Sequence, residues 1–236
     1  SNMGDKPVKF VSWFDAARVS NWLVNGGTSS SSTETGAYTL VGGQTSGEAP
    51  AVNSGATFYI PTENEWYKAA YYKGGSTNAG YWDYATQSDT APTAVTSGST
   101  GIGSAGNTGN FANYNQGAVW NGLNGNVTTV GTNGGPSAYG AFDMSGNLYE
   151  WNDLDGLAGS SRVERGGYWF DNAFALSSSF RLSLFLSSEF NGLGFRLASP
   201  VSGPAVVPEI DAAGARLVAG LIVCGLALLE RRRHGR

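Results

Sequence analysis

The sequence has 236 residues, of which 35 are glycine, 12% are aromatic and 14% are charged. This length suits one domain of ordinary size with appendages, and the composition favours tight turns around large aromatic side chains over long amphipathic helices. The 14 Lys and Arg against 18 Asp and Glu give a net charge of -4, and four of the positive charges lie between residues 231 and 236. The rest of the chain is therefore acidic, and we expect no nucleic-acid partner because phosphate would be repelled.

The counts of cysteine and histidine limit the chemistry that the chain can perform. Cys224 is the only cysteine and lies in an apolar C-terminal segment, and His234 is the only histidine, in the basic end. A Ser-His-Asp or Cys-His arrangement is therefore excluded from the preceding domain. The start, Ser1 to Gly4, has no signal-peptide pattern. We expect an export signal upstream and an N-terminally incomplete sequence, with translation from Met3 as the alternative.

Two capped helices are predicted in the first third of the chain. Residues 7–11 alternate like a strand, and Ser12 followed by Asp15 is typical of a helix cap, with the helix ending at Gly26-Gly27. Residues 26–55 are rich in Ser, Thr and Gly, which indicates a surface excursion. A short strand is expected at 58–60. Thr62 with Glu65 then predicts a second capping box and a second short helix.

The remainder of the domain has little periodicity. Residues 75–136 show no regular pattern, so we expect both aromatic side chains and ions to hold this stretch in place. Later strands are predicted at 162–163, 167–170 and 194–197. Three arginines are candidates for buried pairing with Glu150, Asp153 or Glu65, because guanidinium forks can bridge loops that lack ladders: Arg165, Arg181 and Arg196.

The C-terminal part has the pattern of a membrane anchor. Pro200 and Pro204 predict an extended linker over residues 200–207. The apolar run 217–229 is followed by Glu230 and three arginines, which predicts a C-terminal transmembrane helix with a cytoplasmic end. A buried terminal helix is the alternative. We therefore expect the preceding domain to be exported and to contact the membrane through this tail.

The order of features in residues 208–236 resembles the PEP-CTERM sorting signal. Pro208-Glu209-Ile210 is followed by the apolar run and the arginine cluster, with Ile210 where the signal usually has proline. The resemblance implies an exosortase-type processing enzyme as a partner. It also implies release to the cell surface or extracellular matrix after processing.

Four segments in the body are similar to the formylglycine-generating family, also called sulfatase-modifying factors. The resemblance covers residues 7 to 199 and implies an α+β, C-type-lectin-like fold that is low in regular secondary structure, over a domain of residues 1–199. The segments share Trp, Glu-Trp and Gly-Gly signatures in the family's order: Val11-Ser12-Trp13, Pro61-Thr62-Glu63 with Glu65-Trp66, Asp143-Met144-Ser145-Gly146-Asn147 with Glu150-Trp151, and Arg165-Gly166-Gly167 with Gly194-Phe195-Arg196.

The resemblance also identifies the catalytic positions of the family. Its oxidoreductase members hold copper through two cysteines, and the matching positions here are Asp171 and Leu176. Cu(I) requires soft ligands, so copper is not expected and no catalytic residue is assigned. Another branch of the family uses non-haem iron held by histidines, which in this chain would have to come from the missing N-terminus.

Calcium is the cofactor that the resemblance implies. One family site corresponds to the turn of Asp143, Gly146, Leu148 and Glu150, whose oxygens are hard donors suited to Ca²⁺. The alternative is a turn in which Glu150 pairs with an arginine. A second family site would use Asn113 and the backbone of Tyr114.

Three functions remain open on the sequence. The first is an exported, non-catalytic domain that binds peptide or glycan through stacking aromatic side chains. The others are a formylglycine-generating-type oxidoreductase or non-haem iron enzyme with ligands from the missing N-terminus, and a structural matrix component. The candidate stacking residues are Tyr81, Trp82, Tyr84, Trp120 and Trp169.

Overall fold

The computed structural model describes residues 3–75 and 79–200. Its regular elements are short, and long connections run between them. In chain order they are α1 (Trp13–Val24), α2 (Glu63–Tyr71), β1 (Thr93–Ala94), β2 (Phe111–Ala112), β3 (Tyr149–Asn152), β4 (Ser161–Arg165), the 3-10 helix η1 (Ala173–Leu176), β5 (Leu182–Phe185) and β6 (Leu193–Phe195). The prediction of an α+β domain with little regular structure is confirmed.

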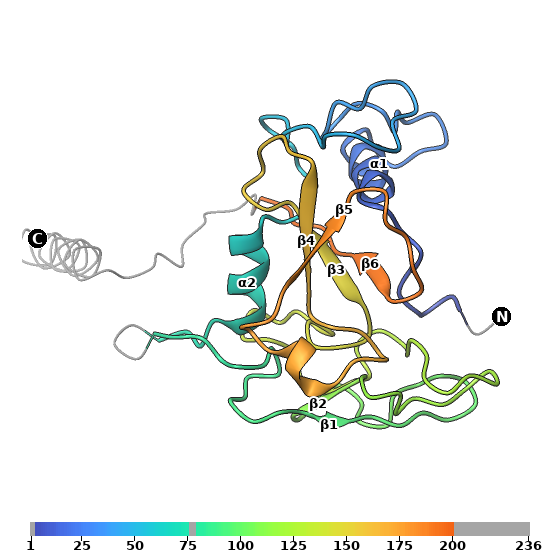
Figure 1. Cartoon of the computed structure of the whole chain (residues 1–236), viewed down its shortest axis with the longest axis vertical. Helices are drawn as coiled ribbons and strands as arrows, with labels where there is room; N and C mark the ends of the chain where they lie inside the picture. The colour runs from blue at the N-terminus through green and yellow to red at the C-terminus, as the bar shows by residue number, and fades with distance from the viewer. Residues whose placement is uncertain (1–2, 76–78, 201–236) are drawn as a thin grey trace, which may run out of the picture. The chain divides into compact units, whose positions relative to one another are not determined.

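The central element is a four-stranded sheet in the order β5-β4-β3-β6, with β4 and β3 in the middle (Figure 1). β4 is antiparallel to both β3 and β5, whereas β6 is parallel to β3. Successive side chains of a strand point to opposite faces. The face that carries Trp151 meets the segment leading into α1, since its indole donates to the Val11 carbonyl at 2.9 Å. The face that carries Glu150 meets α2 through Trp66.

Both predicted helices form with the predicted caps. Ser12 and Asp15 make a reciprocal capping box at α1, and Thr62 and Glu65 make another at α2. Each box satisfies backbone N–H groups that have no partner inside the helix. The buried face of α1 includes Trp13 and the small residues that allow it to lie close to the core.

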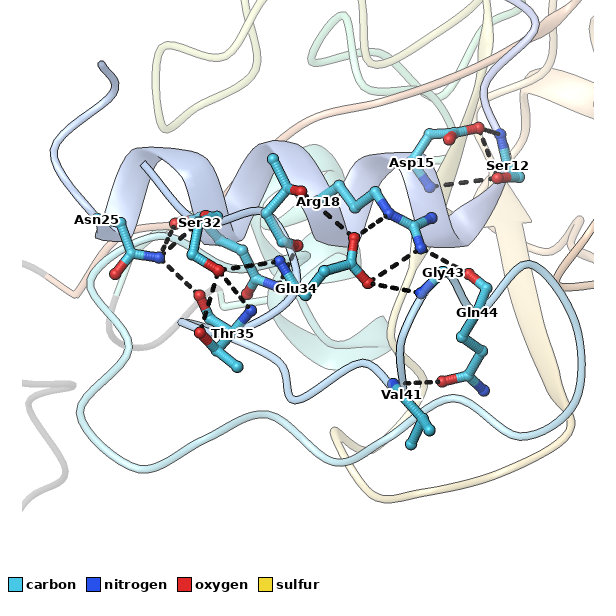
Figure 2. Close-up of polar contacts among 12 residues, drawn as sticks. Ser12, Asp15, Arg18, Asn25, Ser32, Glu34, Thr35, Val41, Gly43 and Gln44 are labelled. Atoms are coloured by element: carbon cyan, nitrogen blue, oxygen red, sulfur yellow. Dashed lines mark hydrogen bonds and ion pairs between the residues drawn. The ribbon is translucent and has the colours of Figure 1, made fainter. Parts of the chain in front are cut away.

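The excursion after α1 is held to the helix by polar contacts, as Figure 2 shows. The Arg18 guanidinium donates to the Glu34 carboxylate at 2.8 Å and to the Gln44 carbonyl at 2.8 Å. The Asn25 amide donates to the carbonyls of Ser32 and Thr35 at 3.0 and 2.6 Å. The Ser- and Thr-rich segment is therefore ordered by side-chain to backbone hydrogen bonds in place of a sheet ladder.

Aromatic side chains hold the stretch between α2 and β3, as predicted for residues 75–136. Its only strands among the described residues are the two-residue pair β1 and β2. Trp120 and Trp169 pack with Val127 and Leu148 in one buried cluster. The Trp120 indole also donates to the Val127 carbonyl at 2.8 Å. These anchors give a loop region the buried apolar surface that a sheet would otherwise supply.

Several strand predictions are wrong or displaced. Residues 7–11 form no strand, and Phe10 has a φ of 59°, because its N–H turns to the Phe190 carbonyl. Residues 167–170 form a turn, since Gly166 and Gly167 both have positive φ. The strand predicted at 58–60 is a single bridge between Tyr59 and Ala198. The last strand lies at 193–195 instead of 194–197.

Buried ion pairs join the helices and loops to the sheet. Arg196 pairs with Glu150, as predicted for one of the three arginines, whereas Arg165 pairs with Glu63 of α2. Arg181 is largely exposed and lies 3.9 Å from Glu63. Among the described residues Glu65 pairs with no arginine and instead accepts hydrogen bonds from Thr62 and Tyr59.

The most buried pair is Arg162 with Asp153, at 2.5 Å, and each side chain is 1% exposed. The Tyr38 hydroxyl donates to the same carboxylate at 3.0 Å, and the guanidinium also donates to the Leu157 carbonyl at 2.7 Å. Burial raises the pKa of Asp153 to about 6 in spite of Arg162. The Asp153 carboxylate therefore joins the distant Tyr38 segment to Arg162 of β4.

Replacing this carboxylate tests how much the fold depends on it. We expect Asp153→Ala to lower the free energy of unfolding by about 3–5 kcal/mol, because Arg162 is left buried without its counter-charge. The control is Lys73→Ala, which breaks the exposed pair with Asp89 and is expected to cost less than about 1 kcal/mol. Urea unfolding at neutral pH measures both. Equal losses in the two variants would contradict the assignment.

Candidate functional site

The predicted calcium turn lies beside a cavity of about 400 Å³. Asp143, Leu148 and Glu150 line this cavity together with Asn147 and Arg196, so the fold brings three of the four predicted residues to one place. Gly146 does not line it. Its φ of 80° allows close approach to Asn113, since an added Cβ would lie 2.4 Å from the Asn113 carbonyl oxygen.

The two carboxylates of the cavity differ in their hydrogen-bond partners. Asp143 accepts hydrogen bonds from the Gly131 N–H and the Asn133 amide, both at 2.8 Å. Burial raises the pKa of Asp143. Glu150 accepts from the Trp66 indole at 2.8 Å and from two nitrogens of Arg196. Asp143 therefore retains one lone pair on each oxygen for a hard cation, whereas Glu150 is mostly occupied by its partners.

The second predicted set contains a buried oxygen without a donor. The Asn113 amide nitrogen donates to the Asn126 carbonyl, Thr128 hydroxyl and Asn147 side chain at 2.8–3.2 Å. Its Oδ1 has no partner among the described residues although it is fully buried. The Tyr114 carbonyl accepts from the Gly117 N–H at 3.1 Å. An unpaired carbonyl oxygen is an oxygen donor of the type that Ca²⁺ takes.

Asp171 and Leu176, the two positions predicted to correspond to the copper cysteines, have structural roles. Leu176 ends η1, is fully buried and packs with Ala112 and Ala175. Gly167 makes room for it, since an added Cβ would lie 2.6 Å from the leucine side chain. Asp171 accepts from the Tyr168 N–H at 3.2 Å and bonds to Tyr149, and burial raises its pKa. Neither side chain fits Cu(I), which needs soft ligands.

Glu164 is a buried acid that the sequence did not single out. It lies on β4, is 1% exposed, and its Oε2 has no hydrogen-bond partner among the described residues. Burial, and then the nearby charge of Asp171, raise the pKa of Glu164 to about 8. The carboxyl group is therefore neutral at pH 7. Arg162 and Arg165 stand close to it in the sequence, and only burial of both faces of β4 reveals its state.

The predicted stacking residues are only partly exposed. Trp120 and Trp169 are 5% and 8% exposed, so the prediction that they form binding platforms is wrong. Trp82 and Tyr84 are half-buried, and Tyr81 is 48% exposed. Two phenylalanines that were not predicted are more exposed, at 52% for Phe170 and 64% for Phe174. They flank Asp171 and precede Leu176, on the segment that carries the two copper positions.

Comparisons with known proteins agree with the fold described above. A profile described as "Sulfatase-modifying factor enzyme 1-like domain" matches residues 1–201, whereas no curated protein matches. Among solved structures, Treponema denticola variable protein 1 is 25% identical with a TM-score of 0.51, over 83% of this chain and 72% of its own. CarF is 23% identical with a TM-score of 0.54, over 84% and 69% of the two chains.

The buried state of Glu164 predicts a specific dependence of stability on pH. Its pKa is higher in the folded chain than the usual 4.5. Stability from the neutral carboxyl is therefore complete below about pH 4.5 and is lost as the pH rises through about 8. We expect Glu164→Gln to match the original protein near pH 5 and to be more stable at pH 9.

Chemical unfolding at a series of pH values measures this difference. Glu189→Gln, at an exposed position, is the control and should follow the original protein at every pH. Asp153, whose pKa is about 6, completes its own loss of stability lower in the range and is unchanged in both variants. Parallel curves for the original protein and Glu164→Gln would show that Glu164 is not held neutral.

Proposed function

Because the chain belongs to the family of sulfatase-modifying factor enzyme 1-like domains, we propose that it uses this fold as a non-catalytic binding domain for a peptide or glycan. The observation that carries the proposal is the state of the two copper positions. Leu176 is part of the core and Asp171 caps a turn, so this segment keeps its architecture without soft metal ligands. A shared fold does not imply shared chemistry.

The proposed binding surface is the aromatic face, defined as Phe170 and Phe174. Both rings project from the segment that precedes and forms η1, and both are more than half exposed. Phe170 lies 6.1 Å from the half-buried Tyr168 ring in a stacked arrangement, and Phe174 lies 5.4 Å from Phe180. These ring contacts restrict the two phenylalanine side chains, which limits the conformational entropy lost when a ligand stacks on them.

We propose further that the domain acts outside the cytoplasm. The support is the C-terminal sequence, in which the linker, apolar run and arginine cluster resemble an exported chain with an exosortase-processed tail. These residues, 201–236, lie outside the described part of the chain. No helix among the described residues is long and apolar enough to span a membrane. In this proposal the tail supplies the membrane contact and the domain supplies binding.

Calcium is proposed as a structural ligand of the domain. Asp143 with its free lone pairs and the unpaired Oδ1 of Asn113 support it. The carbonyl of Leu148 and the carboxylate of Glu150 would complete the first set, in competition with Arg196 for Glu150. Such an ion would tie the turn before β3 to the loop that precedes it, and it takes no part in a reaction.

The binding role is tested on glycan and peptide arrays with the full chain. We expect Phe170→Ala/Phe174→Ala to weaken binding of the selected ligand by about tenfold, since each aromatic contact contributes roughly 0.5–1.5 kcal/mol beyond its area. Val41→Ala removes an apolar side chain that is 78% exposed elsewhere and is the control. A structural matrix component would bind nothing on either array.

The enzymatic alternative is tested on the same preparation. A Cys-x-Pro-x-Arg peptide incubated with copper and oxygen is expected to keep the mass of its cysteine. Conversion of that cysteine to formylglycine would overturn the non-catalytic proposal and require metal ligands outside the described residues.

The calcium proposal predicts a change in thermal stability. At a concentration of about 100 times Kd, a ligand bound only to the folded state adds about 2.7 kcal/mol, which corresponds to a rise in Tm of roughly 5–10 °C. Asp143→Asn keeps the shape of the side chain and should remove most of this rise. Asp89→Asn, at an exposed position, should keep it. Identical melting with Ca²⁺ and with chelator would exclude the ion.

A further inference from the structure

Strand β5 forms an edge of the sheet whose outer side is open. It pairs with β4 on one side, and no other strand pairs with it among the described residues. Figure 1 shows β5, in orange, alongside β4. Phe185 is 78% exposed and Leu182 is 38% exposed. Proteins usually protect such an edge with lysine, proline or a bulge, and β5 contains no lysine and no proline.

The side chains of this edge alternate between the two faces of the sheet. Alternation places Arg181, Ser183 and Phe185 on the face of the sheet that meets α2, and Leu182 and Leu184 on the face that meets α1. Arg181 and Ser183 are also exposed. One face of this edge therefore carries a cation, a hydroxyl and an aromatic ring, and the opposite face carries two leucines.

This order is self-complementary in an antiparallel pair centred on Ser183. In that register Arg181 of one copy is opposite Phe185 of the other, twice, and the two Ser183 side chains meet at the two-fold axis. On the other face Leu182 is opposite Leu184, again twice. Cation–π, hydroxyl and apolar cross-strand pairs are all favourable, and no like charges are opposed.

We propose that two copies of this chain associate through β5 in this register, forming a continuous eight-stranded sheet across a two-fold axis. The occupant of the open edge is thus a second copy, since an isologous interface needs one patch that complements itself. The contact is one strand wide and much smaller than a standard interface of about 1,600 Å². Association is therefore weak and depends on concentration.

A disulfide trap reports the register directly. In a Cys224→Ser background of the full chain, Ser183→Cys places two thiols across the axis, and mild oxidation should give a covalent dimer. Ser187→Cys, at an exposed position four residues along the chain, is the control and should cross-link at least tenfold more slowly. Equal cross-linking of the two variants would overturn the register.

A charge exchange tests the same pairing without a covalent bond. Phe185→Lys opposes Lys to Arg181 of the other copy and should abolish the dimer in sedimentation equilibrium. Adding Arg181→Glu turns each repulsive pair into an attractive one and should restore it. Both positions are exposed, and thermal melting confirms that the variants are folded. A monomer of the original protein at every concentration would overturn the proposal, and this includes the case in which the edge binds another peptide. Failure of the double variant to restore the dimer would also overturn it.

Discussion

The architecture depends on buried contacts between carboxylates and guanidinium groups. Its strands are two to five residues long, so the ladders contribute few of the hydrogen bonds that hold distant segments together. Glu63 joins α2 to β4 through Arg165, and Glu150 joins β3 to Arg196 and to the indole of Trp66. Each of these groups is costly to bury alone, and each is stable only when its partner is in place.

This dependence also explains why the candidate sites are so closely tied to the fold. Glu150 is a predicted calcium ligand and at the same time the partner of Arg196. Asp171 stands at a predicted copper position and also accepts a hydrogen bond from the Tyr168 N–H in the turn before η1. In a fold with few regular elements, the same polar groups stabilise the fold and stand at the predicted site positions. Residues such as Asp171 and Leu176 can therefore support the fold without supplying soft metal ligands.

The outer surfaces are freer to take on a binding role. Phe170 and Phe174 are more than half exposed, and no strand among the described residues pairs with the outer side of β5. The aromatic face requires a ligand with a flat or apolar surface, whereas the strand edge requires a backbone. The two proposed surfaces would recognise by different chemistry, so binding of a ligand and association of copies can be tested separately.

The sequence by itself determined the features that depend on neighbouring residues and on motif order. The capping boxes at Ser12 and Thr62 and the family could be predicted in this way, whereas Glu150 was only one of three candidate acids for Arg196. These features follow from local hydrogen bonding or from a motif that a whole family shares. An observer of the sequence alone could not have separated Trp169, which is buried, from Phe170, which is exposed.

Only the tertiary structure decided which residues are covered by distant segments. Glu164 is flanked by arginines in the sequence but is buried without a partner for one oxygen, because strands on both sides and packing on its face exclude water. Arg165 pairs with Glu63, about a hundred residues earlier, and residues 167–170 turn instead of extending. Such outcomes depend on the sum of long-range contacts, and short sequence patterns carry no information about which segments will meet.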